Sequence, residues 1–275
     1  MSARQTGRGT SVFPVSVLLV VLLPLLLMPL AAVFVFALRG GPKAFWDAIK
    51  APEAQFALRF SLLIAFATTA INAGVCQTYP RVAQAMLDAG WEFMGHAYDQ
   101  MPIHKVEDQA AMINRSMDLL ERFTGKRPVG WLGPGLTQTF ETPELLVDAG
   151  VKYIGDWVYD DEPTVIRTAK GPLVTLPYTV EINDITMMIV QHHESDYLAR
   201  RAIDQFDRLY AEGKNRAKIM ALAIHPYISG QPHRIKYLEA IYDYVARFDG
   251  VLHWNGAEIL DWYVAARGKQ AGVAA

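Results

Sequence analysis

Four apolar runs in this chain each end on a residue that can carry protons or position a polar substrate. The runs end at His96, at Gly133, at Asp156 and at His225. Imidazole and carboxylate side chains are common proton carriers in enzymes. Barrels of alternating strands and helices build their active sites at the C-terminal ends of the strands. We therefore expect these four residues to meet at one site, in an enzyme or in a protein derived from one.

The elements that would position these residues follow an alternating pattern from about residue 66 onward. Strand-length apolar runs alternate with helical periodicity, which predicts an α/β fold around a parallel sheet, either open or closed as a barrel. The predicted helices span residues 81–89, 106–123, 143–149, 197–212, 235–248 and 257–266. Gly90 and Gly150 directly follow two of these helices and resemble glycine C-caps.

Composition limits the classes of partner and cofactor. The 275 residues carry a formal net charge of −2, so no basic surplus is available to neutralise phosphates, and we expect no nucleic-acid partner. The single cysteine, Cys76, excludes an internal disulfide and a cysteine metal site. We expect it to be a small buried residue.

The N-terminal region has a different character. Residues 12–38 contain no charged side chain, and this run exceeds the roughly 20 residues that cross a hydrocarbon core. It predicts a transmembrane helix that anchors the chain. Two basic residues lie on each side of the run, at Arg4 and Arg8 and at Arg39 and Lys43, which leaves the orientation open. A cleaved signal peptide is the alternative, but the run is long for one and has no clear cleavage site.

From about residue 66 to residue 275 the chain resembles the NodB-homology polysaccharide deacetylase superfamily, and most closely its allantoinase-like branch. The resemblance is carried by residues 91–96, 130–135, 156–157, 176–178, 183–184, 191–193, 202–207 and 224–230. It implies a distorted (β/α) barrel that hydrolyses the C–N bond of an amide.

The chain departs from this family at two places. Metal-dependent members carry two histidines separated by three other residues, so the second lies four positions after the first. Here Gln100 occupies that position after His96, and His104 lies eight positions after His96. An amide oxygen is a weak ligand for zinc-like ions, so we expect no cofactor, with a divalent metal such as zinc as the alternative. The family also opens with a strand that carries an aspartate pair, one of them the catalytic base. The chain lacks that strand, so the predicted barrel is incomplete.

Residues 12–65 instead resemble the start of a sulfate-type ABC transporter permease subunit. The matching segments are residues 13–15, 34–41, 44–46 and 57–65. We interpret the chain as two unlike parts, residues 1–65 and 66–275, fused near residues 60–72.

The resemblance assigns roles to three candidate catalytic residues. His225 would be the general acid that protonates the leaving nitrogen, and a buried structural histidine is the alternative. His96 would hold the substrate or polarise its carbonyl. Asp156 would orient His225 or bind a substrate nitrogen, and a structural cap on the next loop is its alternative.

Five further residues are predicted to bind the substrate. Gly133 and Gly135 would shape a tight loop whose backbone N–H groups stabilise an oxyanion. Trp157 would form an apolar wall, and Gln100 and His104 would complete the set. An exposed loop residue is the alternative for His104.

We therefore expect a hydrolase of non-peptide C–N bonds that acts on allantoin or a related cyclic ureide, impaired by the loss of the aspartate pair. A carbohydrate N-deacetylase, a membrane transport component and an inactive fusion are the alternatives. The expected partners are a small amide or ureide substrate and the membrane at residues 12–38, with the hydrolase domain in the cytoplasm. The sequence leaves open whether the chain forms a homo-oligomer.

Overall fold

The computed structural model describes residues 68–271. The predicted membrane helix at residues 12–38, the permease-like segment and most of the predicted junction lie outside these residues. Within residues 68–271, no helix combines the length and the apolar character that a membrane span requires.

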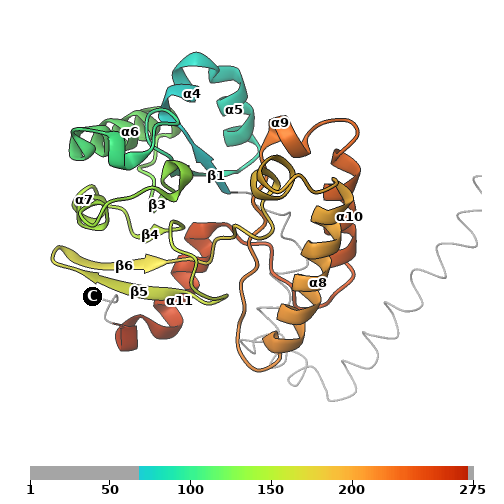
Figure 1. Ribbon diagram of the computed structural model, residues 1–275. Helices are drawn as coiled ribbons and strands as arrows, with labels where there is room; N and C mark the ends of the chain where they lie inside the picture. Colours follow the sequence, from blue (N-terminus) through green and yellow to red (C-terminus); the bar gives the residue numbers. More distant parts are fainter. Residues whose placement is uncertain (1–67, 272–275) are drawn as a thin grey trace, which may run out of the picture. The chain divides into compact units, whose positions relative to one another are not determined.

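A six-stranded sheet lies at the centre of the described region, in the order β1-β2-β3-β4-β6-β5 (Figure 1). The strands are β1 (Thr68–Ile71), β2 (Glu92–Gly95), β3 (Gly130–Trp131), β4 (Tyr153–Ile154), β5 (Thr164–Thr168) and β6 (Gly171–Thr175). Neighbouring strands run parallel, except that β5 is antiparallel to β6. With β1 and β5 at its two edges, the sheet of the described residues is open. The predicted α/β fold is confirmed.

All six predicted helices are present within a few residues of their predicted bounds. They are α5 (Pro80–Asp88), α6 (Gln109–Thr124), α7 (Thr142–Asp148), α8 (Asp196–Gly213), α10 (Ile235–Val245) and α11 (Gly256–Ala271). Gly90 (φ 76°) and Gly150 (φ 90°) adopt the left-handed conformation after α5 and α7, which confirms the predicted glycine caps. The short helices were not predicted: α4 (Ala73–Thr78), η1 (Ile103–Lys105), η2 (Pro134–Leu136), the π-helix η3 (Ile185–Val190) and α9 (Pro226–Ser229).

The sheet buries both of its faces, so adjacent residues of one strand join different cores. In β4, Tyr153 packs with Leu260 and Tyr263 of α11, whereas the next residue, Ile154, packs with Leu146 of α7. This alternation is the two-residue period of a strand. At roughly 1.5–3 kcal/mol for each fully buried large apolar side chain, the two cores hold the strand ends in fixed positions.

A single parallel bridge replaces the strand predicted over residues 219–224. Asn183 pairs with Ala223. The backbone N–H of Ala223 donates to the Ile182 carbonyl, and the backbone N–H of Asp184 donates to the Ala223 carbonyl, each at 3.1 Å. A third core cluster, formed by η3, α8 and α10, packs around this bridge. The apolar run therefore positions the residue that follows it without becoming a regular strand.

Candidate active site

His225 is held by a fully buried carboxylate. Its ring Nδ1 lies 2.7 Å from Asp184 Oδ1, and its backbone N–H donates to Asp184 Oδ2 at 2.7 Å. Ser229 also donates to Asp184 Oδ2 at 2.7 Å. Asp184 has no exposed surface, and three donors surround its charge. Because a carboxylate accepts the Nδ1–H, the neutral imidazole presents the lone pair of Nε2 for proton transfer.

The backbone explains this pairing across 41 residues of sequence. The bridge between Asn183 and Ala223 sets two short segments side by side. Asp184 directly follows Asn183, and His225 lies two residues after Ala223. Pro226 then starts the short helix α9, where Ser229 completes the carboxylate's set of donors.

His96 follows β2 and lies near His225. Burial lowers the pKa of His96, and the positive charge of His225 lowers it further, while hydrogen bonds to the Leu132 carbonyl and to Gln100 oppose this shift. The next residue, Ala97, has φ 57°, a conformation that costs free energy in a residue other than glycine. Because its pKa is lowered below 6.5, His96 is mainly neutral at pH 7.

Asp156 is buried at the end of β4, with 4% of its surface exposed. Its Oδ1 accepts the backbone N–H of Gly133, and its Oδ2 has no hydrogen-bond partner among the described residues. Burial raises the pKa of Asp156 to about 7, against the opposing effect of the Gly133 N–H.

Two predictions for this part of the site need correction. Asp184, and not Asp156, orients His225, because Asp156 follows β4 whereas the Asn183–Ala223 bridge delivers Asp184. The predicted oxyanion donor at Gly133 is already engaged, since its N–H donates to Asp156.

Tyr178 belongs to the same region as Asp184 and Asp156, whose charges act on its phenol. Burial and the charges of Asp184 and Asp156 raise the pKa of its phenol to about 12. Its oxygen lies 3.3 Å from Asn183 Nδ2, the side chain beside Asp184. Strand ends β2, β3, β4 and β6 and the bridge thus contribute His96, Gly133, Asp156, Tyr178 and His225 to one region, as the sequence predicted for four of the five.

The other predicted binding residues surround this region at different depths. Gly135 is exposed with φ 63° inside η2, where only glycine is free of strain. Trp157 is half-buried against the core and makes an edge contact with Tyr159. Gln100 is exposed and hydrogen-bonds with His96. His104 is exposed on η1, and its backbone N–H donates to Thr137.

The donor set does not fit a firmly held divalent metal. Within residues 68–271, no group of three or more histidine, cysteine, aspartate or glutamate side chains is arranged to hold an ion. The residue four positions after His96 is the amide Gln100, a weak ligand for zinc-like ions.

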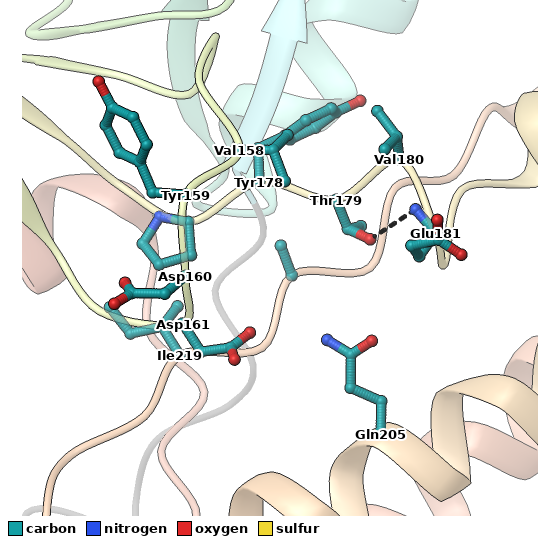
Figure 2. A pocket seen from close by; sticks show the side chains of 12 residues that line it. Val158, Tyr159, Asp160, Asp161, Tyr178, Thr179, Val180, Glu181, Gln205 and Ile219 are labelled. Atoms are coloured by element: carbon teal, nitrogen blue, oxygen red, sulfur yellow. Dashed lines mark hydrogen bonds between the residues drawn. The ribbon is translucent and has the colours of Figure 1, made fainter.

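A cavity of about 240 Å³ lies beside the predicted site rather than at it. Figure 2 shows its lining, to which the β4–β5 loop contributes Tyr159 and Asp161 and α8 contributes Gln205. Tyr178, which lies near the pair of His225 and Asp184, is part of the lining of this cavity. None of the eight predicted catalytic and binding residues is part of the lining.

Sequence reasoning gave no role to two residues that the structure brings into the site. Both were noted within the matching segments, residues 176–178 and 183–184. The available signal was position, because Tyr178 lies three residues after β6 and Asp184 directly follows the bridge residue Asn183.

Comparisons with known proteins identify relatives of this arrangement. Residues 64–154 match the family model described as polysaccharide deacetylase. A peptidoglycan deacetylase of Helicobacter pylori is 26% identical over 219 residues, which cover 67% of this chain and 74% of that protein. A putative polysaccharide deacetylase of Schizosaccharomyces pombe is 27% identical over 62% of this chain, and the match spans only 60% of that relative's length.

Solved structures of similar fold include a probable polysaccharide deacetylase and an allantoinase. A probable polysaccharide deacetylase from Pseudomonas aeruginosa superposes with a TM-score of 0.66 at 27% identity, covering 73% of this chain and 69% of that one. The Puue allantoinase superposes with a TM-score of 0.69 at 24% identity, covering 81% and 75%, which shows a shared fold. The resemblance of this chain to the polysaccharide deacetylase superfamily is thereby confirmed, and its likeness to the allantoinase-like branch is consistent with these matches.

Proposed function

We propose that this chain hydrolyses a non-peptide C–N bond of a cyclic ureide such as allantoin. The observation that carries the proposal is the dyad of His225 and Asp184, in which a buried carboxylate holds an imidazole at a bridge end. A carboxylate that accepts the Nδ1–H fixes the tautomer in which Nε2 exchanges protons.

The dyad can serve both proton transfers of amide hydrolysis. His225 Nε2 takes one proton from water as the water oxygen bonds to the carbonyl carbon, and the carbonyl oxygen becomes an oxyanion. The same nitrogen then gives that proton to the leaving nitrogen as the C–N bond breaks. The carbonyl re-forms as the product acid, and His225 ends as it began. This cycle does not require the aspartate base of the family's first strand.

Two observations support a ureide substrate. The resemblance is closest to the allantoinase-like branch, and the Puue allantoinase shares the fold. The described residues also offer no three-ligand metal group, which fits a hydrolysis in which hydrogen bonds polarise the carbonyl.

A carbohydrate N-deacetylase is the second candidate. The sequence relatives favour it, because the Helicobacter pylori protein is named a peptidoglycan deacetylase and the Schizosaccharomyces pombe protein a putative polysaccharide deacetylase. In this case activity should depend on an added divalent metal, and Gln100→His should increase it by restoring the histidine spacing of the metal-dependent members.

The test compares allantoin with an N-acetylglucosamine oligomer as substrates of the purified full-length chain, with and without zinc. His225→Ala should lower the rate on the accepted substrate by roughly 10²–10⁴-fold. The exposed His233→Ala is the matched control and should retain the wild-type rate. Turnover that survives His225→Ala would remove the dyad from the mechanism.

We also propose that residues 12–38 anchor this hydrolase in a membrane, with the hydrolase domain in the cytoplasm. Membrane fractionation tests the anchor, and protease protection in inverted and right-side-out vesicles tests the orientation. If the chain turns over neither substrate, complementation of sulfate uptake distinguishes a transport component from an inactive fusion.

A further inference from the structure

Tyr178 is placed among the catalytic groups without a role in the dyad. The charges of Asp184 and Asp156 both act on its phenol, although these two acids come from different segments. It follows β6, the strand next to β4 in the sheet. Its hydroxyl contacts the side chain of Asn183, the neighbour of Asp184, and its Cβ lies beside Gly155, the neighbour of Asp156.

The neighbouring amide fixes the direction in which the Tyr178 hydroxyl can donate. Asn183 Oδ1 accepts the backbone N–H of Ile185 at 3.0 Å, so the amide orientation is determined and Nδ2 faces Tyr178 at 3.3 Å. An amide nitrogen can only donate. The phenol oxygen therefore accepts from Asn183, and the phenol proton is directed to another acceptor.

The proposed hydrolysis needs such a donor. The oxyanion that forms when water attacks the carbonyl is stabilised by preorganised hydrogen bonds, each commonly worth roughly 10²–10³ in rate. The predicted donor at Gly133 is engaged with Asp156, and the described residues hold no three-ligand metal group. A proton donor from another strand end fills this requirement.

The side chain is also open to a small molecule. Tyr178 is half-buried, and its ring forms part of the wall of the 240 Å³ cavity. In Figure 2 its hydroxyl points away from Gln205, which enters from α8 on the opposite side.

We propose that Tyr178 is a catalytic residue whose hydroxyl donates a hydrogen bond to the carbonyl oxygen of the scissile amide. The hydrogen bond strengthens as that oxygen becomes negative, while His225 transfers the protons. The phenol keeps its own proton throughout the cycle, and its pKa of about 12 leaves it protonated across the working pH range. This inference rests on the proposed function.

Tyr178→Phe in the full-length chain tests it, with rates measured on allantoin and on the N-acetylglucosamine oligomer. We expect kcat to fall by roughly 10²–10³-fold with KM changed less than threefold, because the bond strengthens only in the transition state. Asn183 retains its contact with the Thr179 carbonyl at 3.4 Å, so the thermal midpoint should change little. Tyr79→Phe is the matched control, since Tyr79 is exposed and lies outside the cavity lining.

The outcomes separate the two proposals. A wild-type chain that is active, with a folded Tyr178→Phe variant at the wild-type kcat, overturns the role of Tyr178 and leaves the dyad standing. A loss confined to KM overturns the oxyanion role in the same way. A wild-type chain that neither hydrolyses nor binds these two compounds in calorimetry overturns the proposed function, and the role of Tyr178 with it.

Discussion

Replacing Asp156 with asparagine should change how the stability of this protein depends on pH. Burial raises the pKa of Asp156 from 3.8 to about 7. Between these values the carboxyl group is neutral in the folded chain and ionised in the unfolded chain, so folding takes up a proton. The free energy of unfolding then falls as the pH rises, by about 1.4 kcal/mol per pH unit across this window. Over the whole window the loss is about 4 kcal/mol.

The asparagine side chain cannot ionise, and its carbonyl can still accept the Gly133 N–H. Urea unfolding of the wild type and of Asp156→Asn, followed by circular dichroism at pH 5 and pH 8, measures the difference. The variant should gain about 3 kcal/mol relative to the wild type between these two pH values. Asp160→Asn controls for the loss of one negative charge in the neighbouring exposed loop. A difference between Asp156→Asn and wild type that is equal at both pH values would refute the reasoning.

Three further outcomes test the site and its support. His96 should titrate below pH 6.5 in NMR, because burial and the charge of His225 lower its pKa; His225→Ala should raise that pKa, and an unchanged titration contradicts the proximity of the two rings. Gly130→Ala should lower the stability by about 1–3 kcal/mol in thermal unfolding, because its Cβ would lie 2.2 Å from the Tyr153 ring. Gly213→Ala, whose Cβ meets nothing within 4 Å, should be nearly neutral. Dialysis against a chelator should leave the rate on allantoin unchanged, and loss of activity restored by zinc would contradict metal-independent hydrolysis.

The helices and the chemistry-bearing strand ends could be predicted from the sequence because their signals are local. Apolar residues at helical spacing and a terminal glycine predicted α5 and α7 closely. The run over residues 219–224 was misread, because an apolar run alone does not reveal whether neighbouring strands will pair with it. The edge strand β5 was missed, since its outward-facing residues are polar or only partly buried.

The dyad shows why the site could be predicted only in part. His225 was identified at the end of its run, but its partner depends on a bridge between segments about 40 residues apart. Asp156 and Asp184 are both acids beside strand-like segments, and nothing in the sequence spacing alone decides which of them reaches the imidazole. Only the packing of η3, α8 and α10 around the bridge makes that choice.

The half-buried carboxylate of Glu92 in β2 links the beginning of the described domain to its end. It accepts the Tyr153 hydroxyl at 2.8 Å and the backbone N–H of Ala257, 165 residues later, at 3.0 Å. During synthesis on the ribosome, Glu92 therefore emerges long before the helix start that completes its hydrogen bonds. A nascent chain interrupted before residue 256 would keep this carboxylate in the sheet without its helix donor, a natural target for chaperones and proteases. The donor from α11 thus reaches this carboxylate only after nearly all of the described domain has been synthesised.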